Sequence, residues 1–248
     1  MAGTALPGRL TWLLTKLESK RQETPRVITL RLSSPDWPGH TPGQHVDVRL
    51  TAEDGYQAQR SYSIGSVPAE GWLDLTVEDI TSGEVSPYLA EFLQPGDTLE
   101  LRGPIGGYFN WTPDDGGPLL LIAGGSGVVP LMSMLRLRQE VGSTIPATLL
   151  MSSRDETDII YQDELEALAA DPMLRVVHTL TRGHPPDWTG YTRRIDAAML
   201  AEVAGTPAPS GLAYVCGPTG LVEAVASDLV TLGYAPDRVL TERFGPTS

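Results

Sequence analysis

The first half of the chain contains short runs in which apolar and polar residues alternate. In the segment 45–50, Val46, Val48 and Leu50 fall on one face, and the residues between them are polar. A period of two is typical of a half-buried β-strand. The same alternation, interrupted by turns rich in Pro and Gly, predicts six strands, at 11–17, 26–32, 45–50, 61–66, 72–80 and 98–102.

A single brief helix is expected at 86–93, between the last two of these strands. Six short strands with one helix are typical of a closed antiparallel barrel. The tract Thr112–Pro118, which reads Thr-Pro-Asp-Asp-Gly-Gly-Pro, then has the composition of a linker. We therefore expect a first domain over residues 1–112, an all-β, six-stranded antiparallel barrel.

After the linker the hydrophobic pattern changes, because continuous apolar runs now alternate with segments of helical period. Such alternation implies a parallel sheet with helices on both faces. The apolar runs predict five strands, at 119–123, 147–151, 175–180, 213–216 and 239–241. The helical segments are 130–141, 162–170, 196–204 and 221–232. We therefore expect a second domain over residues 113–248, of the α/β class with a five-stranded parallel sheet.

Composition and charge narrow the possible partners. Of the 248 residues, 41% are hydrophobic and 20% are charged, which is an ordinary globular mixture. No apolar run approaches the roughly 20 residues that cross a bilayer, and the first residues lack the basic start of a signal peptide. The net charge of −13 disfavours nucleic acid and anionic membranes as partners. The expectation is a cytoplasmic monomer without membrane insertion.

Cysteine and histidine are too few for most metal chemistry. Cys216 is the only cysteine, which excludes an internal disulfide and an iron–sulfur centre held by four protein thiolates. The four histidines have no paired spacing such as His-x-x-x-His, so no zinc or haem ligand set is visible. No metal site is predicted, and any redox cofactor is expected to be organic.

Two motifs in the first half suit phosphate groups. In Arg60-Ser-Tyr-Ser63 the first and third residues share a strand face, and a guanidinium can bind a pyrophosphate through two parallel bonds. In Gly83-Glu-Val-Ser86 the serine is a natural N-cap, Pro87 fits the first helical position, and free N–H groups there favour an anion. Taken alone, each motif also fits a structural role, as a surface strand or a simple helix cap.

Two further motifs lie in the second half. Gly124-Gly-Ser-Gly-Val-Val-Pro130 follows a buried strand and opens a helix, where glycine lets the backbone approach a pyrophosphate. Pro130 stands where the usual dinucleotide fingerprint has its third glycine. Cys216-Gly-Pro218 ends the fourth strand of this half. The alternative for Cys216 is the role of a small buried hydrophobic residue.

In this order, the four motifs resemble those of the ferredoxin–NADP reductase family, from about Trp12 to Phe244. The resemblance implies an FAD-dependent NAD(P)H oxidoreductase, with FAD on the barrel and the dinucleotide on the α/β domain. Hydride would pass from the nicotinamide to the flavin, and electrons would then leave singly. Because the cysteines for an attached iron–sulfur centre are missing, the acceptor is expected to be a separate protein such as a ferredoxin or flavodoxin.

The resemblance also assigns binding roles, position by position. It implies FAD contacts by Arg60, Ser61, Tyr62, Ser63, Val77, Gly83, Val85 and Ser86. It implies dinucleotide contacts by Gly125, Ser126, Gly127, Pro130, Ser153, Arg154, Tyr161, Thr181, Arg182, Cys216, Gly217, Pro218 and Phe244. Tyr161 is expected to stack on the adenine. Phe244 is expected to cover the flavin face that the nicotinamide must reach, or simply to pack at the end of the last strand.

Three of the residues are implied in catalysis. Ser63 would lie near the flavin N5 atom, and Cys216 beside the nicotinamide C4 atom without acting as a nucleophile. Glu242 would lie at the flavin edge, where a carboxylate could stabilise the half-reduced cofactor or relay a proton.

The nucleotide preference depends on the ends of the second and third strands of the α/β half. Arg154 and Arg182 suit the extra phosphate of NADP, so NADPH is expected. Asp155 and Glu156 leave NADH open.

Two alternatives to a reductase with a separate protein acceptor stay open. The chain could be an electron-relay subunit docked permanently on a larger redox enzyme, or a free flavin or quinone reductase. Docking surfaces have no short motif, so the sequence does not name the acceptor.

Overall fold

The first sheet comes from the half of the chain with alternating apolar residues. In the computed structural model, which describes residues 10–205 and 211–245, six antiparallel strands pair in the order β4-β3-β6-β1-β2-β5. They are β1 (Trp12–Thr24), β2 (Val27–Ser33), β3 (His45–Thr51), β4 (Gln57–Ser63), β5 (Trp72–Glu78) and β6 (Thr98–Ile105). Their apolar faces turn inward and form one core, in which Leu30, Val48 and Leu75 are fully buried. The predicted six-stranded antiparallel sheet is confirmed.

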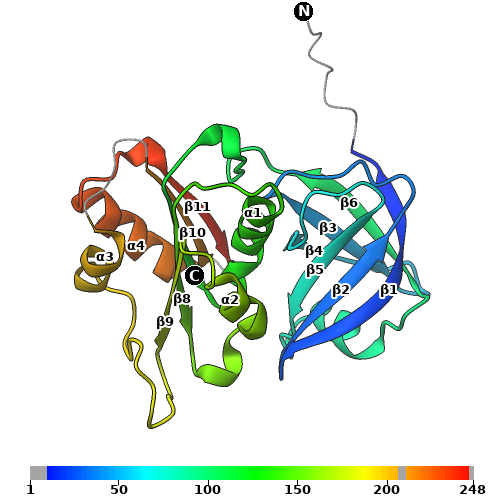
Figure 1. Cartoon of the computed structure of the whole chain (residues 1–248). Coiled ribbons are helices and arrows are strands. Elements are labelled where there is room, and N and C mark those ends of the chain that lie inside the picture. Colours follow the sequence, from blue (N-terminus) through cyan, green and yellow to red (C-terminus); the bar gives the residue numbers. More distant parts are fainter. Residues whose placement is uncertain (1–9, 206–210, 246–248) are drawn as a thin grey trace, which may run out of the picture.

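The two edge strands of this sheet, β4 and β5, come together as the sheet curls round (Figure 1). They meet through one antiparallel bridge, between Ile64 and Leu75. The Gly65 N–H also donates to the carbonyl of Asp74, at 2.9 Å. The sheet is therefore shaped like a barrel, although no continuous ladder closes it.

Strand β1 is longer than its hydrophobic pattern predicts. The predicted strand ends at Leu17, whereas β1 runs to Thr24 and stays paired with β2 up to the turn. A register shift between Leu17 and Ser19 marks the point where the strand leaves the core. Beyond that point β1 consists of polar residues and has no apolar face to bury. Its extended conformation is maintained there by backbone pairing with β2. Together with β2, which pairs with β5 along its whole length, this part of β1 forms a hairpin that ends in the turn at Pro25 and Arg26.

The second sheet follows the change of pattern. It has five parallel strands, as predicted, and they pair in the order β11-β10-β7-β8-β9. They are β7 (Leu119–Gly124), β8 (Ala147–Ser153), β9 (Leu174–Leu180), β10 (Leu212–Pro218) and β11 (Val239–Phe244). The helices are α1 (Val128–Glu140), α2 (Gln162–Leu168), α3 (Ala197–Ala204) and α4 (Thr219–Thr231). Helices α1 and α2 cover the face toward the barrel, and α3 and α4 cover the far face (Figure 1).

Short helical segments complete the fold. They are η1 (Tyr88–Phe92), η2 (Pro113–Asp115), η3 (Gly125–Gly127), η4 (Glu156–Asp158) and η5 (Pro236–Arg238). Within the described ranges, no helix is long and apolar enough to cross a membrane.

The strand order brings the carboxyl ends of β7, β8 and β10 to the middle of the second sheet. From β7 the chain continues to β8 and β9 on one side, and it then crosses back to β10 on the other. In open parallel sheets such a reversal leaves a crevice at the carboxyl ends of the strands, where ligands bind. Gly124 ends β7 and Pro218 ends β10, so both glycine motifs of the second half lie at this crevice.

The chain crosses between the domains as a packed segment. Trp111 is fully buried in the core of the α/β domain, and its indole N–H donates to the Gly116 carbonyl at 3.0 Å. Phe109 meets the Tyr214 ring edge-on at 5.3 Å, and the Tyr214 hydroxyl donates to the carbonyl of Asn110. The boundary between residues 112 and 113 stays our proposal. The outer ends of the predicted domains, residues 1–9 and 246–248, lie outside the described residues.

This crossing depends on close backbone packing at Gly43, in the loop before β3. Gly43 has a φ of 95°, and a Cβ atom there would lie 1.8 Å from the Phe109 carbonyl oxygen. We expect Gly43→Ala to lower the free energy of unfolding by about 2–4 kcal/mol, because overpacking adds to the cost of the left-handed conformation. Gly55 is the matched control, since it has a φ of 86° and no atom within 4 Å of the added Cβ.

Gly55→Ala should therefore cost only about 1–2 kcal/mol, the price of the backbone conformation alone. Urea unfolding of both variants measures the difference. Equal losses at the two positions would contradict the packing argument.

Candidate functional site

A cavity of about 590 Å³ lies where the barrel meets the α/β domain. Most of the residues predicted to bind FAD line it, namely Arg60, Ser61, Tyr62, Ser63, Gly83, Val85 and Ser86. Val77 is the exception, because its side chain is fully buried in the barrel core while its neighbours Thr76 and Glu78 line the cavity. A contact by the Val77 backbone, as the sequence predicted, stays a prediction.

The β4 wall of this cavity combines a cation with an aromatic ring. Arg60 is exposed, its Nη1 donates to the carbonyl of Gln59 at 2.6 Å, and it has no carboxylate partner among the described residues. Two residues along, Tyr62 is half-buried, and burial raises the pKa of its phenol to about 12. This wall therefore offers charge-assisted donors to an anion and a neutral ring beside them.

The opposite wall is the loop that leads into η1. Its geometry corrects the predicted helix cap, because Ser86 does not cap the helix through its side chain. Its hydroxyl instead accepts the backbone N–H of Ile80, at 3.1 Å, and so closes the loop across its base. The Gly83 N–H donates to the Ile80 carbonyl within the same loop, at 2.6 Å. Local sequence suggested a cap because a serine before a proline is compatible with both arrangements.

A second cavity, of about 180 Å³, lies in the crevice at the ends of β7, β8 and β10. Gly125 lines it with a φ of 55°, and a Cβ added there would have no atom within 4 Å. Gly127 has the opposite surroundings, since its Cβ would lie 2.2 Å from the Cys216 carbonyl oxygen. One glycine thus leaves open space for a ligand and the other allows close packing against β10, which is the division expected of a dinucleotide site.

Two predicted contacts of this motif lie beside the second cavity without lining it. Pro130 is buried in the first turn of α1, and Gly127 is buried against β10. Ser126 lines both cavities, and its hydroxyl donates to Glu78 of the barrel at 3.2 Å.

The predicted nucleotide-selecting residues meet at the ends of β8 and β9. Ser153, Arg154 and Thr181 line the second cavity. The N–H of Arg182 donates to the carbonyl of Arg154 at 2.8 Å, so the two exposed arginines are neighbours, although Arg182 itself does not line the cavity. The Ser153 hydroxyl is buried without a hydrogen-bond partner among the described residues, so it can serve a bound ligand.

Sequence reasoning missed an ion pair that crosses the second cavity. Arg26, in the turn of the β1–β2 hairpin, pairs with Asp158 of the α/β domain at 3.0 Å. The carboxylate is the main reason that the pKa of Arg26 is raised above its usual value. No motif could have indicated this contact, because its two members lie 132 positions apart and in different domains.

The position of Tyr161 contradicts its predicted role. It was expected to stack on the adenine, but its ring is buried between the domains, with the side chain of Arg136 over one face at 4.6 Å. Its hydroxyl lies 2.5 Å from the Thr76 hydroxyl of β5. The ring therefore has no free face for a nucleotide, because tertiary contacts from two elements occupy it.

The three predicted catalytic residues converge at the junction of the two sheets. Cys216 and Glu242 are neighbours across β10 and β11. Ser63 ends β4 opposite His45 of β3, and the His45 Nδ1 lies 3.8 Å from the Glu242 Oε1. His45 thus joins the site as a residue that the sequence showed only on the polar face of a strand.

Burial sets the protonation of this group. It raises the pKa of Glu242 to about 7, and the Glu242 Oε2 has no hydrogen-bond partner in the described part of the chain. Burial, helped by Glu242, also raises the pKa of the Cys216 thiol, so Cys216 is not a thiolate near neutral pH. Burial lowers the pKa of His45, partly offset by Asp47. Glu242 is therefore the group suited to exchange a proton near pH 7.

Phe244 stands between the two cavities. It ends β11 beside Pro218, is 36% exposed, and lines both cavities together with Glu78 and Ser126. The two cavities therefore share a wall. Of the three predicted catalytic residues, Ser63 lines the larger cavity, whereas Cys216 and Glu242 line neither. Among the described residues, no group of three or more His, Cys, Asp or Glu is placed to hold a metal ion.

Comparison with known proteins agrees with this division of the site. Residues 14–110 match the oxidoreductase FAD-binding domain, and residues 121–227 match the oxidoreductase NAD-binding domain. Ferredoxin–NADP reductase B of Sorangium cellulosum is 39% identical over 191 residues, which cover 74% of this chain and 76% of that protein. The glycine betaine monooxygenase reductase subunit of Pseudomonas aeruginosa is 32% identical over 209 residues. That match covers 83% of this chain and 56% of the subunit, so the chain spans little more than half of that relative.

Solved structures share the two-domain fold. A ferredoxin NADP+ reductase from Neisseria gonorrhoeae, with bound FAD and NADP, superposes with a TM-score of 0.80 at 23% identity. The match covers 94% of this chain and 98% of that one. A cytochrome P450 reductase from Amycolatopsis superposes with a TM-score of 0.83 at 25% identity, over 96% of this chain and 71% of that one.

The raised pKa of Glu242 predicts how the free energy of unfolding depends on pH. Folding favours the protonated acid, so the cost of ionising it appears as pH rises from about 4.5 through about 7. Glu242→Gln removes that cost. Between pH 5 and pH 8 the wild type should lose up to about 3 kcal/mol of unfolding free energy relative to the variant. Urea unfolding at both pH values tests this, with Glu53→Gln at an exposed turn as control. A constant difference between Glu242→Gln and wild type would refute the assignment.

Proposed function

The chain belongs to the ferredoxin–NADP reductase-like family of FAD-dependent NAD(P)H oxidoreductases, and we propose that it passes electrons singly to a separate acceptor protein such as a ferredoxin. The single observation that carries this proposal is the shared wall between the two cavities, at Glu78, Ser126 and Phe244. Two cofactors bound there would meet at this wall, next to the ends of β10 and β11 that carry Cys216 and Glu242. Bound FAD supplies the acceptor for hydride and the ability to release electrons one at a time.

The residues of the larger cavity fit FAD. The guanidinium of Arg60 and the loop that Ser86 closes would hold the pyrophosphate, because both present donors to an anion. Tyr62 would lie beside the flavin ring, and the Ser63 hydroxyl would reach the N5 atom. The half-buried Tyr62 and the cavity of about 590 Å³ support this placement.

The junction would align the reacting groups and handle the proton. Cys216, buried and neutral, would shape the surface beside the nicotinamide. Glu242 would accept or release a proton at its Oε2, which is buried without a partner among the described residues. Its pKa of about 7 suits this role near neutral pH. Phe244 would cover the flavin face until the nicotinamide displaces it.

The second cavity would hold the dinucleotide, and NADPH is the proposed substrate. Arg154 and Arg182 are exposed neighbours and have no ion-pair partner within the described ranges. The third arginine near this cavity, Arg26, is already paired with Asp158. Two unpaired guanidinium groups favour the extra phosphate of NADPH over the hydroxyl of NADH.

The acceptor is proposed from the relatives, whose names include a ferredoxin–NADP reductase and a monooxygenase reductase subunit. A cytoplasmic monomer that meets its acceptor transiently is part of the proposal. The second candidate is an electron-relay subunit of a larger redox enzyme, which the monooxygenase reductase subunit favours.

The proposed function predicts a yellow protein that releases FAD on denaturation. With NADPH it should reduce a ferredoxin and ferricyanide, since electrons leave singly. Chromatography identifies the released flavin. Steady-state assays then compare ferredoxin, ferricyanide, free flavin and a quinone as electron acceptors. Turnover with free flavin or quinone but with neither one-electron acceptor would contradict the proposal, as would the release of FMN alone.

The nucleotide preference has its own test. The double variant Arg154→Ala with Arg182→Ala loses charge-assisted bonds worth about 1.5–3 kcal/mol each. A loss of 1.4 kcal/mol in binding free energy corresponds to a factor of about ten in affinity. The value of kcat/KM for NADPH should therefore fall at least about tenfold, and kcat/KM for NADH should stay unchanged. Arg175→Ala is the control, at an exposed arginine near the opposite end of β9. Equal losses with both nucleotides would show that the two arginines do not select NADPH.

A further inference from the structure

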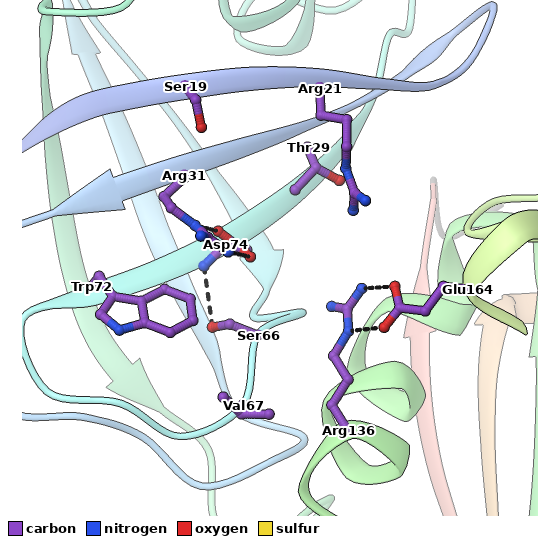
Figure 2. Close-up of a pocket in the computed structure, with 10 residues that line it drawn as sticks. All are labelled: Ser19, Arg21, Thr29, Arg31, Ser66, Val67, Trp72, Asp74, Arg136 and Glu164. Carbon is purple, nitrogen blue, oxygen red and sulfur yellow. Dashed lines mark hydrogen bonds and ion pairs between the residues drawn. The ribbon is translucent and has the colours of Figure 1, made fainter. Parts of the chain in front are cut away.

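A third cavity, of about 480 Å³, opens between the barrel and helices α1 and α2. It shares no lining residue with the two cofactor cavities. Two ion pairs face each other across it, one from each domain (Figure 2). Arg31 and Asp74 pair on the barrel side through two bonds of 2.8 Å. Arg136 of α1 and Glu164 of α2 pair on the other side through bonds of 2.7 and 2.6 Å. Each arginine already has its carboxylate, so this cleft is a junction between domains and not an anion site.

Arg136 ties the two sides of this cleft together. Besides its two bonds to Glu164, its Nη1 donates to the carbonyl of Gly65 in the barrel, at 2.5 Å. Its side chain is only 13% exposed, and it lies over the ring of Tyr161. One side chain thus joins α1 to α2 and to the backbone of the barrel.

Tyr161 connects Arg136 to the wall of the flavin cavity through a chain of hydrogen bonds. Its hydroxyl bonds to Thr76, the Thr76 and Thr29 hydroxyls lie 2.8 Å apart, and Thr29 donates to Glu23 at 2.5 Å. The chain of hydrogen bonds therefore runs from the α/β domain through β5 and β2 to β1. Thr76 lines the FAD cavity, so the bond from Tyr161 ends on the wall of that cavity.

The backbone at Tyr161 is held in an unfavourable conformation. It has a φ of 62° and a ψ of 31°, and it is the only residue other than glycine with a positive φ among the described residues. Such a conformation persists only where the surroundings impose it, and it points to a functional constraint. Tyr161 lies directly before α2 and eight positions after Ser153, in the segment that leaves the nucleotide cavity.

We propose that Tyr161, with Arg136 on its ring, is a positioning residue that orients the dinucleotide-binding domain against the flavin wall for hydride transfer. This proposal rests on the proposed function. Hydride transfer depends on the separation and alignment of two rings held by different domains, and a shift of about 1 Å can cost on the order of a hundredfold in rate. A hydroxyl that joins the two domains at the cavity wall limits such shifts.

The test is Tyr161→Phe, which keeps the ring under Arg136 and removes only the bond to Thr76. In single-turnover experiments, the rate of flavin reduction by NADPH should fall at least about tenfold. FAD content and the dissociation constant of NADP should change less than about threefold, because Tyr161 itself lines neither cofactor cavity. Reoxidation of the dithionite-reduced protein by ferricyanide should keep its rate, since that step does not need the dinucleotide domain.

Tyr191→Phe is the matched control. The Tyr191 hydroxyl donates to Glu202 at 2.6 Å, and Arg193 lies over its ring at 5.1 Å. These contacts resemble those of Tyr161, but all of them stay within the α/β domain. Flavin reduction in this variant should match the wild type.

Gly65→Ala is a second probe that removes no hydrogen-bonding group. A Cβ at Gly65 would lie 3.0 Å from the Tyr161 hydroxyl and 3.4 Å from the Arg136 Nη1. It should push the domains apart and slow flavin reduction in the same way. Hydrogen exchange without nucleotide gives an independent readout. Tyr161→Phe should raise exchange in β5 and around α2 together, whereas Tyr191→Phe should leave β5 unchanged.

The outcomes separate the positioning role from the proposed function. If NADPH and NADH both fail to reduce the wild type, the proposed function is wrong and the positioning role falls with it. If the wild type is reduced and Tyr161→Phe is reduced equally fast, the positioning role alone is wrong, even where the variant melts at a lower temperature. Slower reduction with unchanged reoxidation, and exchange raised in both domains, is the result that supports it.

Discussion

The proposed site is divided between two sheets, so its geometry depends on the buried contact that joins the two domains. Trp111 follows the barrel along the chain, and its side chain is buried in the core of the α/β domain. The Tyr214 hydroxyl donates a hydrogen bond to the carbonyl of Asn110, directly before Trp111. Burying an indole removes a large apolar surface from water, which makes this contact costly to open. Polar contacts at Ser126 and Tyr161 then refine an arrangement that apolar packing has already fixed.

Burial at the junction shifts the pKa values of ionisable side chains away from those they would have in water. Glu242 is kept partly away from solvent, so its acid form survives to near neutral pH. Cys216 is kept as a thiol by the same burial. The barrel contributes Ser63 and His45 from paired strand ends. The proposed site therefore forms only where the strand ends of the two sheets meet, because neither sheet holds all of its residues.

The sequence predicted the fold well because the hydrophobic period changes between the two halves, and each of the eleven strands that the structure describes overlaps a predicted one. The bounds differ most at β1, which runs past its apolar pattern, and at β4, which begins before the predicted strand. The site motifs were also visible, since each needs a particular backbone near a phosphate. The errors occur where a local pattern fits two tertiary arrangements. Ser86 could cap a helix or close a loop, and an exposed ring and a buried one look alike at Tyr161. Arg26 and His45 were missed because their partners come from the other domain.

The β1–β2 hairpin carries Arg26 out of the barrel and into the wall of the dinucleotide cavity. A ligand in that cavity touches both domains, so it binds the joined domains more tightly than the separated ones. By thermodynamic linkage, the same factor must favour association of the domains whenever the cavity is occupied. A dinucleotide bound at the ends of the parallel strands would therefore also stabilise the contact between the two domains.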